Sequence, residues 1–317
     1  MSPTSLTAVR LPAAVSSGDL IIDRRYEWAR ESLAAGDYAA AIDLAQQIVA
    51  LAPAYAPAWF LLGEAREQAS DTAGATEAFM RAKAADPADG QGAALRLARL
   101  GATPPVAMPV GYLRALFDGY AADFDAALTG GLRYRGPDML LFAVAPACGG
   151  EAMRFESALD LGCGTGLGGA AFRPFCARLA GVDLSRGMLG EARTKGLYDE
   201  LAEAEAMTYL GGEAARGAQY DLILAADVLI YFHQLRQVPP AATKVLKPGG
   251  VLAFTIETHD GDGVILRDTL RYAHGAAHVR GALSLGGLEP VVLEPASART
   301  EKGVPVPGLV VVARKPA

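Results

Sequence analysis

Two hydrophobic patterns divide this chain after its first hundred residues. In the first part, the segment 36–42 returns as 70–76 and Pro53 returns as Pro87, so two copies align at a period of 34. A period of this length, with small residues where helices cross and a closing proline, is typical of stacked pairs of antiparallel helices. The pattern therefore predicts a small all-helical domain over residues 21–101.

The repeat spacing resembles that of tetratricopeptide (TPR) repeats, with residues 90–101 as a single capping helix. Two repeats and a cap bury little apolar surface on their own. We therefore expect this domain to pack against the rest of the chain, to form a homodimer, or to bind a protein partner. Residues 1–20 are expected to be a flexible N-terminus, and the uncharged, proline-containing stretch 102–110 predicts a linker.

In residues 111–317, short apolar runs alternate with helical patterns after a first helical stretch over 111–128. This alternation is typical of α/β proteins with a doubly wound parallel sheet. The last two runs, 288–293 and 309–313, are joined by a polar loop and predict a C-terminal antiparallel hairpin. The other predicted strands are 157–161, 178–183, 202–205, 220–226 and 251–257, and the predicted helices are 166–176, 185–195 and 235–246.

Composition narrows the classes of protein that fit. Of the 317 residues, 51% are hydrophobic and 20% charged, so the chain can bury sizeable cores. The net charge of −6 is spread evenly and leaves no basic face for nucleic acid. The three cysteines are too few and too irregular for a disulfide framework. Without a signal-peptide pattern or a long apolar run, we expect a cytoplasmic protein that does not span a membrane.

A glycine-rich loop carries the clearest chemical signal. Five of the 36 glycines fall between Gly162 and Gly169, at the predicted turn from strand to helix. Such a turn lets a ligand approach the backbone and the helix N-terminus. The spacing GxGxxG is also met, so the loop alone is compatible with a dinucleotide.

Two carboxylates beside this loop favour a different ligand. Asp160 ends the preceding strand, where it would repel a pyrophosphate and attract an ammonium or sulfonium group. Asp183 ends the next strand, 21 residues after Gly162, where an acidic side chain can accept hydrogen bonds from both ribose hydroxyls. S-adenosylmethionine has a ribose and a cationic amino-acid tail without a phosphate, and it fits both carboxylates.

Four motifs, in order, resemble those of class I S-adenosylmethionine-dependent methyltransferases. They are DLGCGTG (160–166), GVDLSRGML (181–189), YDLILAADVLIY (220–231) and LKPGG (246–250). The resemblance covers about residues 111–317 and implies a Rossmann-like sheet of seven strands. It also implies that S-adenosylmethionine is converted to S-adenosylhomocysteine in the reaction. Three further segments, YLRALFDGYAADF, LRYRGP and RYAH, are similar to a bacterial group in which TPR repeats precede such a domain.

The resemblance also implies which residues hold the cofactor. Four groups of residues are implied. The first forms the loop beneath the methionine moiety, and the second supplies carboxylates for the ammonium and the ribose. The third contacts the adenine, and the fourth closes over the carboxylate end of the cofactor. In that order these residues are Gly162, Cys163, Gly164 and Gly166; Asp160 and Asp183; Leu184 and Met188; and Tyr120 and Arg135. Glu205 and Ala206 stand where the family usually has Asp-Ala beside the adenine amino group. Asp227 faces the methyl-transfer site in many relatives, and it is equally a candidate helix N-cap.

Methyl transfer from a sulfonium is an in-line displacement, so the protein mainly aligns the reactants and excludes water. A base is needed only when the nucleophile arrives protonated. The candidate catalytic residues are His274, His259 and Tyr231, and the candidate acceptor-binding residues are Arg271, Tyr272, Glu257 and His233. A surface position for His259 and a structural role for the RYAH segment are the competing interpretations. No metal is expected, because His274 and His278 have no further ligand at suitable spacing.

We therefore expect transfer of a methyl group from S-adenosylmethionine to oxygen or nitrogen of a small metabolite, and Arg271 favours an anionic one. Two alternatives stay open. One is a protein methyltransferase that recruits its substrate through the repeats, and the other is a cofactor-binding scaffold without catalysis.

Overall fold

The computed structural model describes residues 16–126, 128, 134–148 and 153–317, so most of the expected flexible N-terminus lies outside the described residues. The chain divides into two compact units, and the boundary along the sequence falls between Leu116 and Phe117. This division falls inside helix α6 (Val110–Tyr120), which begins at the last residue of the expected linker. No helix in the described ranges has the length and apolar character needed to cross a membrane.

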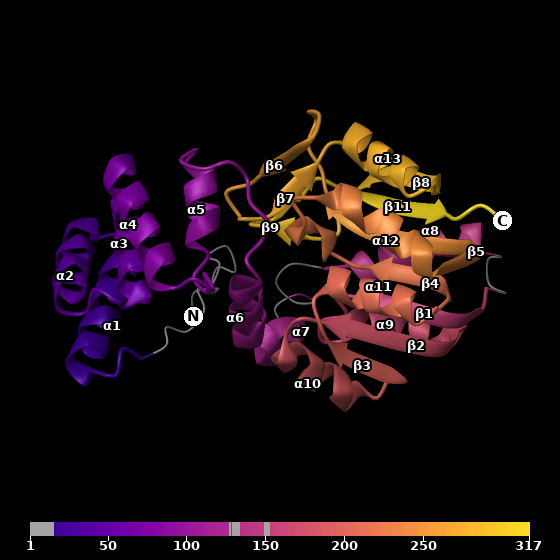
Figure 1. Cartoon of the computed structure of the whole chain (residues 1–317), viewed down its shortest axis with the longest axis horizontal. Coiled ribbons are helices and arrows are strands. Elements are labelled where there is room, and N and C mark those ends of the chain that lie inside the picture. Colours follow the sequence, from indigo (N-terminus) through magenta and orange to yellow (C-terminus); the bar gives the residue numbers. More distant parts are fainter. Residues whose placement is uncertain (1–15, 127, 129–133, 149–152) are drawn as a thin grey trace. The chain divides into compact units, whose positions relative to one another are not determined.

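The first unit is built from antiparallel helices (Figure 1). They are α1 (Leu20–Ala34), α2 (Tyr38–Leu51), α3 (Ala56–Gln68), α4 (Thr72–Ala85) and α5 (Ala93–Arg99). Asp19, Asp37 and Asp71 cap α1, α2 and α4 by accepting backbone N–H groups. A Cβ atom at Gly63 would lie 2.6 Å from the Phe79 ring, so α3 and α4 pack closely at a glycine. The predicted helical region is confirmed, and its assignment to TPR repeats stays a prediction.

The second unit contains a seven-stranded sheet with the order β3-β2-β1-β4-β5-β11-β8 (Figure 1). Strands β1 to β5 run parallel, and β11 is antiparallel to both β5 and β8. This order confirms the predicted doubly wound sheet and its C-terminal antiparallel pair. The strands are β1 (Phe155–Leu161), β2 (Cys176–Asp183), β3 (Glu200–Glu203), β4 (Tyr220–Ala225), β5 (Leu246–Glu257), β8 (Glu289–Ala296) and β11 (Gly308–Arg314).

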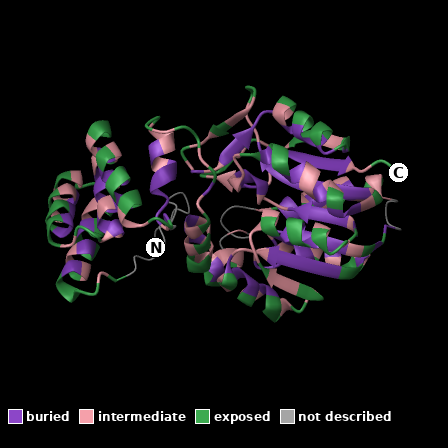
Figure 2. Cartoon of the chain, in the orientation of Figure 1, coloured by how far each residue is buried: buried purple, intermediate pink, exposed green. Residues whose placement is uncertain are grey.

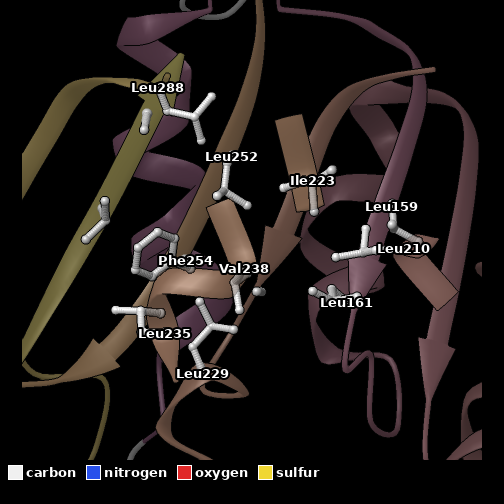
Figure 3. Packing of buried hydrophobic residues seen from close by; sticks show 14 of the residues in the cluster. Leu159, Leu161, Leu210, Ile223, Leu229, Leu235, Val238, Leu252, Phe254 and Leu288 are labelled. Atoms are coloured by element: carbon white, nitrogen blue, oxygen red, sulfur yellow. The ribbon is translucent and has the colours of Figure 1, made fainter. Parts of the chain in front are cut away.

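Hydrophobic cores cover both faces of the sheet, because side chains alternate between the faces along each strand. Leu159 and Leu161 of β1 point into one core, which includes Leu210 and Val238 from the helices that cover that face (Figure 3). Ala158 points into the other core, together with Leu140. The central strands β1, β2, β4, β5 and β11 are accordingly mostly buried, whereas the edge strands β3 and β8 and the outer sides of the helices are more exposed (Figure 2).

The helices of this unit after α6 are α7 (Phe124–Ala126), α8 (Gly136–Ala147), α9 (Leu167–Phe172), α10 (Arg186–Lys195), α11 (Ala206–Ala215), α12 (Val238–Val245) and α13 (Ala276–Leu285). Two short strand pairs complete it, namely β6 (Val264–Leu266) with β7 (Tyr272–His274), and β9 (Thr300–Glu301) with β10 (Val304–Pro305).

Several predicted element boundaries were wrong, each for a local reason. The helix predicted over 166–176 ends at Phe172, because Pro174 cannot continue its hydrogen bonding and Cys176 already begins β2. The strand predicted over 202–205 ends at Glu203, because Glu205 caps α11. The helix predicted over 235–246 starts as a 3-10 turn and becomes α12 only at Val238.

Candidate active site

The loop between β1 and α9 has a backbone that requires glycine. Gly162, Gly164 and Gly166 have φ angles of 71°, 54° and 95°, which lie in the left-handed region that other residues adopt only with strain. A Cβ atom at Gly162 would also overlap the side chain of Val228, which follows β4. The loop therefore brings its backbone close to the neighbouring strand end.

Asp183 at the end of β2 joins the glycine loop to the loop between β2 and α10. Its Oδ2 accepts a hydrogen bond from the Gly164 N–H at 2.9 Å, and its Oδ1 accepts one from the Ser185 N–H at 2.8 Å. Burial raises the pKa of Asp183, and these backbone donors partly oppose that rise. Each carboxylate oxygen keeps a second lone pair, so Asp183 can still accept hydroxyl donors.

Asp160 at the end of β1 is 2% exposed, and burial raises its pKa to about 7. Its Oδ2 accepts a hydrogen bond of 2.7 Å from the Tyr198 hydroxyl, which itself accepts one of 3.0 Å from the Gly169 N–H. A Cβ atom at Gly169 would lie 2.5 Å from the Tyr198 ring, so the glycine makes room for the tyrosine. Tyr198 lies in the loop before β3 and belongs to no motif, so the sequence alone does not mark it.

The segment from α6 to α7 is hydrogen bonded to both loops. Asp118 accepts from the Ser185 hydroxyl at 2.6 Å and from the Gly187 N–H at 3.0 Å. Asp125 accepts from the Thr165 hydroxyl and pairs with Lys195 at 2.5 Å. Tyr120, a predicted cofactor residue, is half-buried between these two anchors. Asp118 and Asp125 are further residues that the sequence did not reveal.

The remaining predicted cofactor residues surround the same loops. Cys163 is buried, and burial raises the pKa of its thiol, which is therefore neutral. Met188 is buried in α10, whereas Leu184 is half-buried. The Glu205 carboxylate accepts the N–H groups of residues 207 and 208 at the start of α11, at 3.0 and 2.8 Å, and Ala206 is the first residue of that helix. The expected contact of this pair with an adenine stays a prediction.

Arg135 stands immediately before α8. The side chain is exposed, and the backbone N–H donates to the carbonyl of Ala298 at 2.9 Å. Residues 129–133, which connect α7 to Arg135, lie outside the described residues. Its predicted role at the carboxylate end of the cofactor stays a prediction.

A second group of charged side chains gathers beyond the ends of β4 and β5, and we name it the arginine–carboxylate cluster. It consists of Asp227, Glu257, Arg267, Arg271, Arg299 and Glu301. Arg299 pairs with Asp227 at 2.5 Å and with Glu257, and Arg267 approaches Glu257 at 3.2 Å. Three guanidinium groups thus face three carboxylates.

Asp227 is positioned by the backbone as well as by Arg299. Its φ angle is 57°, its N–H donates to the Thr255 hydroxyl at 2.8 Å, and that hydroxyl donates back to its Oδ1 at 3.0 Å. The Asp227 carboxylate is therefore held by Thr255 and Arg299, and the following 3-10 turn is capped by Val228 instead. A small cavity borders Asp227, Thr255, Glu257 and Arg299.

The structure brings three predicted residues, Asp227, Glu257 and Arg271, into one cluster. It adds Arg267, Arg299 and Glu301, which the sequence analysis missed. The separations in sequence between Arg299 and its partners Asp227 and Glu257 are 72 and 42 residues, so no local pattern marks them. The cluster is therefore a product of the tertiary fold.

The predicted aromatic residues at this end pack on one another. The Tyr231 ring lies 5.4 Å from the Phe117 ring in an edge-to-face arrangement. The His233 ring lies 5.3 Å from that of Tyr272, which is fully buried in β7. Tyr231 and His233 remain half-buried at the edge of this packing.

The two candidate catalytic histidines differ in exposure, since His274 is buried and His259 is half-buried. His274 is fully buried and stacks on His278, with the rings 5.6 Å apart. Burial, together with His278, lowers the pKa of His274 to about 3, so its ring is neutral at ordinary pH. His259 accepts the Gly261 N–H at 3.1 Å within its own loop. Their catalytic roles stay predictions. Among the described residues, no group of three or more suitable side chains could hold a metal ion.

Comparisons with known proteins agree with this geometry. Residues 159–252 match the family described as a methyltransferase domain. The chain is 33% identical over 104 residues to malonyl-[acyl-carrier protein] O-methyltransferase of Enterobacter lignolyticus (strain SCF1), and 33% identical over 152 residues to methyltransferase-like protein 27 of Homo sapiens. These matches cover 33% and 46% of this chain, but only 40% and 58% of the relatives.

A solved structure shares the fold. It is the 1,6-didemethyltoxoflavin-N1-methyltransferase of Burkholderia thailandensis with bound 1,6-didemethyltoxoflavin and S-adenosylhomocysteine. The TM-score is 0.53 at 20% identity, over 68% of this chain and 93% of that chain. Residues 159–252 therefore resemble a methyltransferase domain, and the solved structure shows the same fold.

Proposed function

We propose that this chain transfers a methyl group from S-adenosylmethionine to an oxygen or nitrogen atom of a small metabolite. The observation that carries the proposal is the pair of carboxylates beside the glycine loop, the buried Asp160 and the half-buried Asp183. Among the described residues, neither carboxylate has a cationic partner within ion-pair distance. A buried carboxylate without a cation is costly, so a positively charged ligand fits this site.

S-adenosylmethionine matches the donors and acceptors that this site offers. Its ammonium and sulfonium groups would compensate Asp160, and its ribose hydroxyls would donate to Asp183. A dinucleotide would instead bring a pyrophosphate toward Asp160, and the repulsion would be strong at a buried position. The charges at this site therefore favour S-adenosylmethionine over NAD.

When bound, S-adenosylmethionine supplies an electrophilic methyl group. The residues of the chain would bind, orient and shield the reactants. The glycine loop offers a backbone that approaches the ligand. Asp125 ties α7 to that loop, and Asp118 ties α6 to the loop after β2. The arginine–carboxylate cluster provides charged groups beyond the ends of β4 and β5, where acceptors bind in open α/β sheets.

The proposal includes the acceptor atom and the charge of the acceptor. The names of the relatives include an O-methyltransferase and an N-methyltransferase, which supports an oxygen or nitrogen acceptor. Arg271 favours an anionic acceptor. Recruitment of a protein through the helical unit, a homodimer, a scaffold without catalysis and a cytoplasmic location stay predictions.

Titration calorimetry of the full-length protein with S-adenosylmethionine, S-adenosylhomocysteine and NAD tests the choice of cofactor. We expect the first two to bind and NAD not to bind. Asp183→Asn should weaken S-adenosylmethionine binding by about tenfold or more, because charge-assisted hydrogen bonds to the ribose are lost. Glu289→Gln, an exposed position on β8, is the matched control and should bind normally. Binding of NAD alone would overturn the proposal.

A further inference from the structure

The arginine–carboxylate cluster has a buried inner part and an accessible outer part. The side chains of Arg299 and Glu257 are each 4% exposed, whereas those of Arg271 and Glu301 are 24% and 21% exposed. The inner Arg299 is held by Asp227 and Glu257. The outer pair, Arg271 and Glu301, is therefore the part that a ligand can reach.

Glu301 compensates the outer guanidinium group of Arg271 and also approaches the inner one of Arg299. Its Oε1 lies 2.5 Å from Nη1 of Arg271 and 3.3 Å from Nε of Arg299. Burial alone would raise the pKa of Glu301, but Arg271 and Arg299 lower it below its usual range, so the side chain is ionised. Among the residues that the structure describes, the second carboxylate of Arg271 is the more distant Glu257, at 3.9 Å. Loss of Glu301 would thus leave one positive charge in excess.

The element that carries Glu301 is small. Strands β9 and β10 pair only with each other, through a two-residue turn at Lys302 and Gly303, whose φ angles are 50° and 79°. These angles are typical of a type I′ hairpin, and a hairpin of this size is marginally stable by itself. Val304 beside the turn is 65% exposed. Glu301 can therefore leave Arg271 without a change in the main sheet.

The base of the same hairpin borders the cavity at the ends of β4 and β5. Arg299, Val306 and Pro307 line this cavity together with Asp227 and Glu257. Parallel α/β sheets bind ligands beyond the carboxyl ends of their strands. The outer pair thus lies beside the place where an acceptor is expected.

We propose that Glu301 occupies an anion subsite on Arg271 and Arg299, and that a carboxylate of the methyl acceptor takes its place. The proposal rests on the proposed function and adds the substrate class. Exchange of one carboxylate for another keeps both guanidinium groups paired. A neutral acceptor would leave Arg271 without its close partner, so the subsite selects carboxylates over amides and esters of the same shape.

Chemical rescue of Glu301→Gln tests the subsite. The full-length protein is saturated with S-adenosylhomocysteine, and propionate, which reproduces the glutamate side chain, is compared with propionamide. In Glu301→Gln we expect a lower melting temperature, which propionate restores, and propionate binding at least fivefold tighter than in the wild type. Propionamide should do neither. Glu294→Gln, an exposed glutamate on β8, is the control and should behave as the wild type.

The double variant Arg271→Gln with Glu301→Gln locates the bound anion, because it should lose the gain in propionate binding. Equal propionate affinity in Glu301→Gln and the wild type, equal binding of propionamide, or full binding to the double variant would overturn the subsite. If Glu301→Gln does not fold, Glu301→Asp takes its place, since the shorter side chain keeps its charge but retracts from Arg271. It should also bind propionate more tightly than the wild type, and the absence of a gain contradicts the proposal. Calorimetry with S-adenosylhomocysteine separates the two claims, because its failure would count against the proposed function itself.

Discussion

The Tyr198 hydroxyl donates a hydrogen bond of 2.7 Å to Oδ2 of Asp160. Because the same hydroxyl accepts the Gly169 N–H, one tyrosine joins the end of β1 to the first turns of α9. The carboxylate that we expect to face the cofactor cation is therefore oriented by a residue outside the glycine motif. Tyr198 is a positioning residue for this site.

Removal of the hydroxyl in Tyr198→Phe should shift the pH dependence of cofactor binding. The hydrogen bond from Tyr198 lowers the pKa of Asp160, which burial raises to about 7. Without this bond the pKa of Asp160 rises further, and S-adenosylmethionine affinity at pH 7 should fall about fivefold, the equivalent of one hydrogen bond. Calorimetry from pH 6 to pH 9 should show recovery at high pH. Tyr38→Phe in α2 is the control, and an unchanged pH midpoint in Tyr198→Phe would contradict the assigned role.

Asp160 itself should reduce the stability of the cofactor-free protein. Its pKa is 3.8 ordinarily and about 7 in the folded protein, so between these values only the folded state holds the proton. The contribution of Asp160 to the free energy of unfolding therefore decreases as the pH rises from about 4 to 7, and it stays low above pH 7.

The variant Asp160→Asn removes this penalty. At pH 8 its free energy of unfolding should exceed that of the wild type by up to about 4 kcal/mol, at about 1.36 kcal/mol for each pKa unit. Its S-adenosylmethionine binding should be lost. Urea unfolding at pH 5 and pH 8 measures the first effect, and calorimetry measures the second. A variant that is less stable than the wild type at pH 8, or that binds the cofactor normally, would contradict the account.

His274 should act on stability in the opposite direction. Its pKa falls from 6.5 to about 3 on folding, so below pH 6.5 the unfolded state takes up a proton that the folded state does not. The wild type therefore loses stability through His274 as the pH falls. When the pH falls from 7 to 5, the free energy of unfolding of His274→Leu should therefore rise by about 2 kcal/mol relative to that of the wild type. Urea unfolding of both proteins at pH 7 and pH 5 tests this. If the difference between their free energies of unfolding is the same at both pH values, His274 does not titrate as described.

Two glycines in neighbouring helices make a matched pair. Gly169→Ala in α9 places a Cβ atom 2.5 Å from the Tyr198 ring and should cost about 1–3 kcal/mol, as overpacking does. Gly190→Ala in α10 has no neighbouring atom within 4 Å and should raise stability by about 0.5–1 kcal/mol, because alanine favours helix. Equal effects of the two substitutions on urea unfolding would rule out the packing of Tyr198 against Gly169.

The sequence revealed the part of the site that depends on local chemistry. Asp160, Asp183 and the glycines between them lie within 24 residues at two strand ends, and the alternation of apolar runs was enough to place those ends at one edge of the sheet. The structure adds hydrogen bonds that join them, such as the one from Gly164 to Asp183. The parallel, doubly wound character of the sheet followed from the same alternation, whereas its strand order comes from the structure.

The rest could not be predicted, because its partners are distant in sequence. Tyr198 is 38 residues from Asp160, Asp118 is 67 residues from Ser185, and Arg299 is 72 residues from Asp227. The i,i+4 spacing of His274 and His278 suggested one helical face, but His274 ends β7 and only His278 lies in α13, and the spacing did not indicate that His274 is buried. The type I′ turn that presents Glu301 has a Lys-Gly sequence, which is compatible with many loops.

Methyl transfer is tested most directly by the full-length protein, S-adenosylmethionine labelled in its methyl group, and a small-molecule extract. We expect label to appear in a small product while S-adenosylhomocysteine accumulates, and we expect Asp183→Asn to lower both when S-adenosylmethionine is below saturation. We also expect the labelled product to carry the new methyl group on oxygen or nitrogen. S-adenosylmethionine binding without label in any small molecule, or binding of NAD alone, would contradict the proposed function.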